Sequence, residues 1–571
     1  MIYFVALVAG LAGLLFGFDE GVIAGALEAL RAQFQMSSFD EGLMTAAVPF
    51  GALFGALLAG PLAERLGRRM ALLLAALLFT FGAIFAGLAT AVWMLTACRL
   101  VLGLAVGVAA MVAPLYISES APAARRGMLV SVYQLAITLG ILGAYLVNYA
   151  FDERWRTMFM LGAVPGVALL AGMLLLRDTP RWYVMQGRVD DARMALQRLR
   201  SGSDPKTIEA ELVELEQGVG KHVARASWAD LLSPAVRPAF MVGIGLFFLQ
   251  QLSGINAVIY YAPTVFQESG FDSGSTRLLA TIGVGVVNVL MTLVGMALID
   301  RIGRRRLLYL GFAGTTFSLG LIAVGAATGS QSLDVLAVVG LLGYIAAFAA
   351  SIGPLPWVMM SEIFPSRVRG LAMSVTSLTN WGFNFLVVFS FPVLVAAFGL
   401  GPVFGLYAIV CAVGLFFTWK WVPETSGVTL EDIEKHLMSG QPFGSLRPGS
   451  VAVTDTDAPD IPLTVTRELV AALIPLSPYR QGLLALSEQI VQVAHDNRQV
   501  RTALREVQAR RRVGEAVGVP ALSHADLGPQ RIVLLRFLEH VYFASPVFLA
   551  SVGETSGQQS VAVADTKGAM K

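Results

Sequence analysis

Twelve apolar stretches, each of twenty residues or more, dominate this chain of 571 residues. A helix of about 20 apolar residues crosses the hydrocarbon core of a bilayer. Hydrophobic residues make up 56% of the chain and charged residues only 14%, whereas soluble domains are about 25% charged. We therefore predict an all-α membrane protein with twelve transmembrane helices. The stretches span 2–27, 42–62, 70–90, 92–117, 127–150, 157–176, 238–262, 277–299, 307–327, 334–360, 370–397 and 402–422.

The chain repeats itself. The loop sequence ERLGRR at 64–69 follows the second stretch, and DRIGRR at 300–305 follows the eighth. Parallel repeats of this kind predict two six-helix halves with a substrate site between them near the middle of the membrane. We expect an N-terminal half at 1–176, a cytoplasmic helical linker at 177–237, a C-terminal half with a cytoplasmic helix at 238–437, and a cytoplasmic extension at 438–571.

Basic residues gather on one side of the predicted membrane. If the helices alternate in direction, the arginine-rich loops at 65–69, 125–126, 301–306 and 367–369 share one side. Because cytoplasmic loops are enriched in Lys and Arg, we expect a multi-pass protein of the cell (inner) membrane with both termini in the cytoplasm. The start of the chain lacks a basic region and a cleavage site, so we interpret the first stretch as a retained helix.

No pattern in the sequence points to an enzyme. Cys98 and Cys411 stand alone in apolar stretches, and the five histidines lie in the polar central and C-terminal segments. Neither set has the spacing of metal ligands. We expect no catalytic residue, no cofactor, no metal and no nucleic-acid partner.

The composition changes from about residue 440. The segment 440–465 reads as a linker, 466–513 and 530–543 as helices, and 551–571 as a disordered tail. We expect this extension to be a regulatory or interaction appendage with a possible cytoplasmic partner.

Two charged residues interrupt the apolar stretches of the first half at similar depth. Asp19 lies late in the first stretch, and Arg99 opens the fourth, which runs the opposite way. At about 1.5 Å per residue both reach the outer half of the membrane. An unpaired charge there is costly, so we expect them to pair. The pair is either a proton-coupling site or a structural ion pair. Glu20 and Glu28 are weaker candidates for the proton, because they approach the outer surface.

Amide side chains also occur inside the apolar stretches. Amides donate and accept hydrogen bonds without carrying charge, which suits a neutral polyhydroxylated ligand. Trp357 and Trp381 add flat apolar faces for a sugar ring. The alternative is that the amides only join helices to one another. The amides are Gln134, Gln250, Gln251, Asn256, Asn288, Asn380 and Asn384.

Glycine and proline interrupt two stretches of the second half. Gly254 lies in the seventh and Pro263 follows its last residue directly, and the sequence GPLP at 353–356 lies in the tenth. Proline removes a helical hydrogen bond, and broken helices are typical of substrate gates in transporters. We expect helix breaks here, although close packing by small residues is the alternative.

Charged residues recur with matched spacing in the basic loops of the two halves. We expect them to bridge helices or halves when the cytoplasmic side closes and to separate when it opens. A network present in one state biases the equilibrium between states. The alternative is a topology signal alone, which explains the arginines but not the glutamates. The predicted cytoplasmic gate comprises Arg68, Glu119 and Arg126, and the matching Arg304, Glu362 and Arg369.

These motifs resemble those of the sugar-porter family of the major facilitator superfamily, over residues 2–437. The resemblance rests on GLLFGFD at 13–19, QQLSGINAVIYY at 250–261, SEIFPSRVRG at 361–370 and PETSG at 423–427, together with the repeated loops. It implies twelve helices, cytoplasmic helices between the halves and alternating access. It also implies sugar binding by Gln134, Gln250, Gln251, Asn256, Asn288, Trp357, Asn380 and Asn384.

The resemblance also bears on proton coupling. An aspartate at the position of Asp19 is typical of bacterial proton-coupled monosaccharide symporters, and Arg99 matches its partner position. The sequence departs from the family where Glu64 replaces an aspartate, and where Arg177 and Asp178 replace Pro and Glu. The shorter Asp178 is expected to weaken a cytoplasmic latch.

We therefore predict proton-coupled symport of a monosaccharide, a hexose or a pentose, into the cytoplasm by alternating access. Its partners are the sugar, the proton and the lipid bilayer. Two alternatives remain, an uncoupled facilitative sugar carrier and a sugar sensor that signals through 440–571. The same amides serve several sugars, so the prediction stays at the level of monosaccharides.

Overall fold

The computed structural model describes most of the chain up to residue 447. Our predictions for the C-terminal extension beyond that residue lie outside the described part. So does the side chain of Arg126. The described residues are 1–122, 125–152, 154–201, 204–220, 227–271, 273–328, 333–365, 368–428, 430–439 and 441–447.

Within these residues, twelve helices are long and apolar enough to cross a membrane, which confirms the predicted fold class. Short caps set the connections: α1 ends at a left-handed Gln35, and Ser37 with Asp40 forms a capping box that begins α2. The N-terminal half contains α1 (Ile2–Phe34), α2 (Ser38–Leu66), α3 (Arg68–Gly87), α4 (Val92–Ser120), α5 (Arg126–Ala150), and α6 (Trp155–Leu161) continued by α7 (Ala163–Leu175).

Four short helices connect this half to a second set of six spans. The connecting helices are α8 (Pro180–Met185), α9 (Val189–Leu199), α10 (Pro205–Gly220) and α11 (Trp228–Leu232). The second set contains α12 (Arg237–Leu252) with α13 (Ile255–Glu268), α14 (Gly274–Ile302), α15 (Arg304–Thr328), α16 (Leu333–Ala347) with the π-helix η2 (Phe348–Ile352) and α17 (Leu355–Ile363), α18 (Arg369–Phe398) and α19 (Leu400–Trp421). The helix α20 (Leu430–Met438) and the 3₁₀ turn η3 (Phe443–Ser445) follow.

Small residues let the helices of each half approach closely. A Cβ atom added at Gly17 of α1 would meet the backbone of Ile137 in α5, and one at Gly51 of α2 would meet the backbone of α4. Close backbone approach through small residues is the usual way in which helices associate in a membrane. The pairs α1–α5 and α2–α4 are therefore tightly joined units of the N-terminal half.

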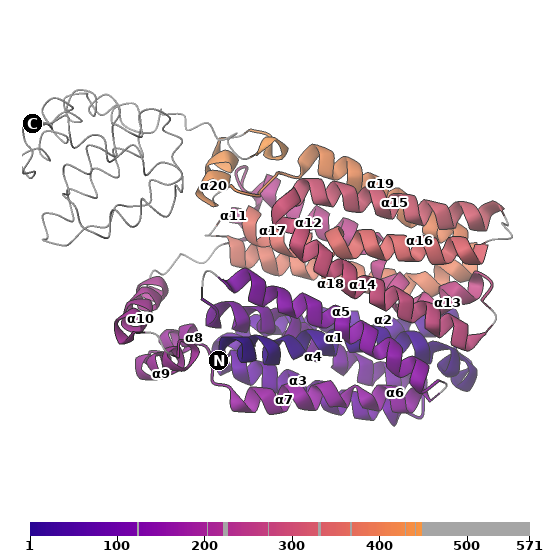
Figure 1. Cartoon of the computed structure of the whole chain (residues 1–571), viewed down its shortest axis with the longest axis horizontal. Helices are drawn as coiled ribbons and strands as arrows, with labels where there is room; N and C mark the ends of the chain where they lie inside the picture. Colours follow the sequence, from indigo (N-terminus) through magenta and orange to yellow (C-terminus); the bar gives the residue numbers. More distant parts are fainter. Residues whose placement is uncertain are drawn as a thin grey trace, which may run out of the picture. The chain divides into compact units, whose positions relative to one another are not determined.

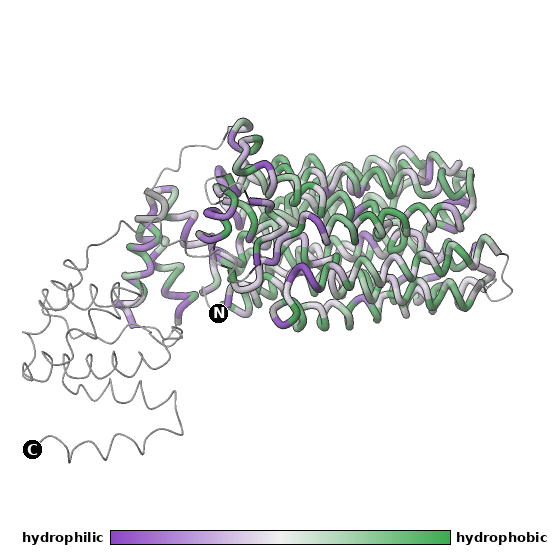
Figure 2. The backbone as a smooth tube through the Cα atoms, turned by 90° about the horizontal axis from the view of Figure 1, so that it is seen from above, coloured by the Kyte–Doolittle hydropathy of each residue, from purple (hydrophilic) through white to green (hydrophobic). Residues whose placement is uncertain are grey.

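The two ends of the helix bundle differ in polarity. The N-terminus lies at the same end as α8, α9 and α10 (Figure 1). Figure 2 shows apolar residues along the long helices and hydrophilic ones concentrated in the short helices beside that end. We call it the basic end, defined by Arg65, Arg68, Arg69, Arg301, Arg304, Arg305 and Arg306.

Aromatic contacts join the two halves from the opposite end to the middle of the bundle. Near the opposite end, Phe39 of α2 packs edge-on against Phe389 of α18, with ring centroids 5.4 Å apart. Three turns along α2, Phe50 lies 5.1 Å from Phe385. The first half therefore lies against the second along the outer parts of α2 and α18.

Polar contacts hold the same end closed. Arg277 of α14 pairs with Glu28 of α1 at 2.9 Å. Arg31 pairs with Glu41 at 2.5 Å within the first half and donates across to the Thr264 hydroxyl at 3.5 Å. This structure is therefore closed at the end opposite the basic one.

Candidate functional site

The predicted ion pair between Asp19 and Arg99 is present in the interior of the N-terminal half. The Asp19 side chain is 2% exposed and that of Arg99 is fully buried, with Nη2 of Arg99 3.4 Å from Oδ2 of Asp19. Arg99 also donates to the backbone carbonyl oxygens of Met44 at 3.1 Å and Thr45 at 3.4 Å. The guanidinium group is thus held by α2 as well as by Asp19.

A proline explains why a carbonyl of α2 is free to bind Arg99. In a helix the carbonyl of Thr45 would accept a hydrogen bond from the N–H four residues later, but that residue is Pro49, which has no N–H. The unused carbonyl accepts from Arg99 instead. If Asp19 is neutralised, Arg99 therefore keeps two acceptors.

At three other prolines, too, a side chain donates to the carbonyl that the missing N–H of the proline leaves without a helical partner. Each time, the carbonyl four residues before the proline accepts from a side chain on a different helix. Two of these bonds lie within the second half, and the third crosses between halves. They join Gln250 to Ile352 before Pro356 at 2.8 Å, Tyr261 to Val388 before Pro392 at 3.1 Å, and Tyr145 to Ile259 before Pro263 at 2.9 Å.

Three of the predicted sugar-binding amides form a continuous chain. Asn256 donates to Gln251 at 2.6 Å, and Gln251 donates to Asn380 at 2.6 Å. All three side chains are 5% exposed, so the chain is buried. Each amide has two donors and an acceptor, and this chain uses only part of that capacity. The remaining groups are available to the hydroxyls of a ligand.

The adjacent Gln250 faces a different partner. Its Nε2 donates to the carbonyl oxygens of Ile352 at 2.8 Å and Gly353 at 2.9 Å, while its Oε1 is buried without a partner. The amide thus fastens α12 to the broken backbone between η2 and α17. Gln250 therefore joins two helices of the second half, and one of its polar atoms keeps an unused hydrogen-bonding capacity.

The other predicted sugar residues make no hydrogen bond to this chain among the described residues. Asn384 has a buried Oδ1 with no partner, and Asn288 is 7% exposed. Gln134 is partly buried, and Trp357 packs edge-on against Phe247 at 4.8 Å. A buried polar atom without a partner is rare in folded proteins and calls for a water or a ligand. These atoms fit a site for a polyhydroxylated molecule.

Helix breaks occur beside the amide chain, at the predicted glycines and prolines. Gly254 has φ +89° between α12 and α13, a value that favours glycine, and an added Cβ would collide with the Tyr407 ring. Gly353 follows the π-helix η2, and Pro356 opens α17. The breaks place Gln251 and Asn256 on either side of Gly254.

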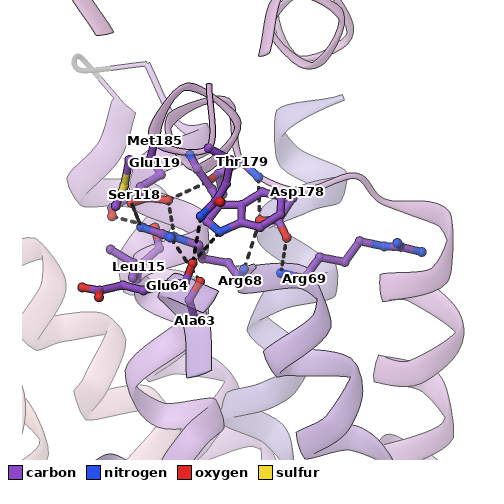
Figure 3. Close-up of polar contacts among 12 residues, drawn as sticks. Ala63, Glu64, Arg68, Arg69, Leu115, Ser118, Glu119, Asp178, Thr179 and Met185 are labelled. Atoms are coloured by element: carbon purple, nitrogen blue, oxygen red, sulfur yellow. Dashed lines mark hydrogen bonds and ion pairs between the residues drawn. The ribbon is translucent and has the colours of Figure 1, made fainter. Parts of the chain in front are cut away.

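Near the basic end of the N-terminal half, Arg68 forms the centre of a buried network (Figure 3). It makes two hydrogen bonds of 2.9 Å to Glu119, which also accepts from Thr179 at 2.6 Å. Asp178 accepts from the backbone N–H groups of Arg68 at 3.0 Å and Arg69 at 3.1 Å. Burial raises the pKa of the Asp178 carboxyl, although these backbone bonds and that of Thr179 act to lower it.

The C-terminal half repeats this network with equivalent residues. Arg304 donates to Glu362 at 3.0 Å, and Glu362 accepts from Thr425 at 2.6 Å. Glu424 accepts from the backbone N–H groups of Arg304 at 2.9 Å and Arg305 at 3.1 Å. The shorter carboxylate of the first half therefore reaches its two N–H groups as closely as the longer one of the second.

Each network lies within one half. Of the other predicted gate residues, Arg369 donates to the carbonyl of Phe364 at 3.1 Å, within its own half. The networks tie α3, α4 and the start of α8 together in one half, and α15, α17 and the segment after α19 in the other.

Comparison with known proteins decides the family. The model of the family "Sugar (and other) transporter" matches residues 5–437. The chain belongs to this family. Among its relatives, the D-xylose transporter of Levilactobacillus brevis is 39% identical over 439 residues, covering 76% of this chain and 95% of that protein. The galactose-proton symporter of Escherichia coli strain K12 is 39% identical over 446 residues, covering 77% and 95%.

Solved structures agree with these relatives. The partially occluded inward open conformation of the xylose transporter XylE from E. coli superposes with a TM-score of 0.67 at 30% identity, covering 75% of this chain and 99% of that one. The inward open conformation of the same protein gives 0.66. The chain is thus a multi-pass sugar porter and not an enzyme.

Sequence reasoning about this porter missed the contacts that close the opposite end. Glu28 was ranked low as a proton site, and its partner Arg277 was not considered. The pair Arg31 and Glu41 was missed as well. The sequence does hint at such contacts, because both arginines lie near the ends of apolar stretches. Their pairing across 249 and 10 residues needs the fold.

The two basic-end networks of the porter are expected to differ in how much they stabilise it. The side chains of Arg68 and Glu119 are 5% and 4% exposed, against 13% and 25% for Arg304 and Glu362. Leaving a buried charge unpaired costs about 3–5 kcal/mol, and a more exposed one less. Glu119→Gln is therefore expected to lower the thermal unfolding temperature of the detergent-purified porter more than Glu362→Gln.

Glu64→Gln, at an exposed carboxylate of the same end, is the control for that measurement and is expected to leave the unfolding temperature unchanged. Equal losses in Glu119→Gln and Glu362→Gln would show that burial does not set the contribution of these networks.

Proposed function

We propose that this porter carries a monosaccharide, a hexose or a pentose, into the cytoplasm together with protons. The observation that carries the proposal is the buried pair of Asp19 and Arg99 in a bundle whose second half holds a buried amide chain. Buried ionisable residues in a membrane are costly and mark proton or ion pathways. The similarity to a galactose-proton symporter supports the same function.

The chemistry of Asp19 suits proton binding. Its closest approach to Arg99 is 3.4 Å, longer than the 2.7–2.9 Å typical of a strong charged hydrogen bond. Arg99 has backbone acceptors on α2 that do not depend on the charge of Asp19. A proton can therefore bind Asp19 while Arg99 keeps these two acceptors, and the α1–α4 contact loosens when it does.

Sugar binding falls to the second half in this proposal. The chain of Asn256, Gln251 and Asn380 offers donors and acceptors without charge, as hydroxyl groups require. Trp381, the residue after Asn380 on α18, lies 5.3 Å from Phe16 of α1, so this part of α18 meets the first half. A sugar bound here contacts both halves and links their movement.

The positive-inside rule assigns the basic end, both termini and α8–α10 to the cytoplasm. The structure is closed at the other end, as a carrier facing the cytoplasm would be. In the proposed cycle the outward-facing carrier binds a proton on Asp19 and a sugar on the amides. The halves then rock to this closed-outside form, release sugar and proton, and return empty.

Sugar-driven proton uptake tests the proposal. Proteoliposomes containing the full chain, suspended in lightly buffered medium, receive one sugar at a time from a panel of hexoses and pentoses. A transported sugar is expected to make the medium more alkaline, and empty liposomes are the control. Transport of labelled sugar with no change in pH would identify an uncoupled carrier, and no transport of any monosaccharide would exclude the substrate class.

A further inference from the structure

A second carboxylate of α1, Glu20, lies buried between the halves. It is 3% exposed, yet no described residue forms an ion pair or hydrogen bond with it. Its neighbour Asp19 has Arg99. An ionised carboxylate without a partner in a membrane protein is costly, and such residues mark functional sites. Glu20 therefore needs an explanation that Asp19 does not supply.

Helical periodicity places Glu20 toward the second half. Residues four apart lie on the same face of a helix, so Glu20 shares a face with Phe16. Phe16 packs against Trp381 of α18, 5.3 Å away. Eight residues beyond Glu20, Glu28 reaches Arg277 of α14. Glu20 thus lies along the face of α1 that meets the second half, whereas Asp19 turns toward α4.

Three tyrosines on two neighbouring helices lie near this carboxylate. Tyr133 and Tyr145 of α5 and Tyr260 of α13 all lie within electrostatic range of Glu20. The hydroxyls of Tyr133 and Tyr260 are buried without a partner, while that of Tyr145 bonds to α13. Two buried hydroxyls without partners and a buried carboxylate without a partner thus gather where α1, α5 and α13 meet.

No cation of the described residues is placed to neutralise Glu20. Arg99 is engaged by Asp19 and α2, and Arg277 by Glu28. The α7 segment packed on α1 has no charged residue. Other charged or titratable groups on the elements packed around α1 are Arg31 on α1, Asp40 and Glu41 at the start of α2, Cys98 on α4, Tyr149 on α5, Arg156 on α6, and Tyr261 and Glu268 on α13. Those at the basic end are Tyr3 on α1, Glu64 and Arg65 on α2, the arginines of α3, and Tyr116 and Glu119 on α4.

We propose that Glu20 is a second proton-binding site that faces the sugar, so that each sugar moves with two protons. This inference rests on the proposed proton-coupled function. Asp19, Glu20 and Arg99 sum to a charge of −1 when both carboxylates are ionised and +1 when both are protonated. The site can therefore bind two protons while its net charge stays between −1 and +1. A protonated Glu20 also gains an O–H donor for the sugar or for a tyrosine oxygen.

The number of charges that move with each sugar tests this proposal. In proteoliposomes of the full chain, the sugar concentration inside is set tenfold above that outside, at equal pH on both sides. The membrane potential that stops net sugar flux is then measured. A tenfold ratio is balanced by about 59 mV for one charge and about 30 mV for two. The wild-type porter is expected to balance near the lower value and Glu20→Gln near the higher.

Two further variants make the result specific. Glu20→Asp keeps a carboxylate and is expected to retain two charges per sugar. Glu268→Gln removes an exposed carboxylate at the end of α13 and is also expected to retain two charges per sugar. Exchange of labelled for unlabelled sugar confirms that each variant still transports. A wild-type balance point near the one-charge value, or no shift in an exchanging Glu20→Gln porter, overturns the proposal. A flux that ignores the potential in the wild type would instead refute proton coupling itself.

Discussion

Asp19→Asn is expected to abolish accumulation of sugar against its gradient while leaving exchange of sugar across the membrane intact. The amide has nearly the shape of the protonated carboxyl and cannot release a proton. Arg99 keeps its bonds to the carbonyls of Met44 and Thr45, so the fold around it survives. Because the amide holds the Asp19 position permanently in its protonated form, the carrier crosses the membrane with sugar bound whether or not Glu20 carries a proton, and it gains nothing from the proton gradient.

The measurement uses proteoliposomes with an imposed pH gradient and membrane potential. The wild type is expected to concentrate labelled sugar, whereas Asp19→Asn reaches only the external concentration. Counterflow, in which internal unlabelled sugar drives uptake of labelled sugar, is expected to stay within a few-fold of the wild type. Glu268→Gln, at an exposed carboxylate far from this pair, is the control and is expected to accumulate normally. Accumulation in Asp19→Asn would remove the proton role from Asp19.

Much of the architecture follows from the sequence because a membrane leaves few options. Backbone groups in hydrocarbon must bond within their own helix, so length and hydropathy alone predict the twelve spans. The repeated loops predict the two matching halves. The networks around Arg68 and Arg304 agree with the repeat, since residues at matching positions of the two halves form matching ion pairs.

The sequence predicts the pairing of Asp19 with Arg99, but it does not predict the partners of the buried amides. Gln250 and Gln251 are neighbours, yet one bonds to the backbone at Ile352 and the other to Asn380. Proline not only breaks a helix but also leaves a backbone carbonyl without its helical donor. The carbonyl that Pro49 leaves free accepts from Arg99. Which side chain reaches a freed carbonyl depends on how neighbouring helices cross, and a single sequence does not specify crossing geometry.

The burial of Glu20 shows a related limit. Its position late in the first apolar stretch suggested a place near the membrane surface, yet the side chain is 3% exposed. The helix α1 continues to Phe34, seven residues beyond the predicted end of the stretch at 27, so Glu20 lies deeper than hydropathy indicates. The polar residues that lengthen α1, including Glu28 and Arg31, are satisfied by partners on other helices.

The amide chain is expected to contribute most of the affinity for sugar. Gln251 is the central link, since it accepts from Asn256 and donates to Asn380. Gln251→Ala removes its own contacts with the sugar and leaves both neighbours without a partner. An unsatisfied buried polar group costs about 1–3 kcal/mol, and each 1.4 kcal/mol is about tenfold in affinity. We therefore expect sugar binding to weaken by about tenfold to a hundredfold.

Titration calorimetry of a transported sugar binding to the purified porter measures this loss of affinity. Asn256→Ala, at the end of the chain, is expected to weaken binding in the same direction but by less than Gln251→Ala, since only one neighbour loses its partner. The control is Gln186→Ala, an exposed amide at the basic end that bonds only to the carbonyl of Glu64. Its affinity should match that of the wild type. If Gln251→Ala and Asn256→Ala both bind sugar as the wild type does, the amide chain joins helices and the sugar binds elsewhere.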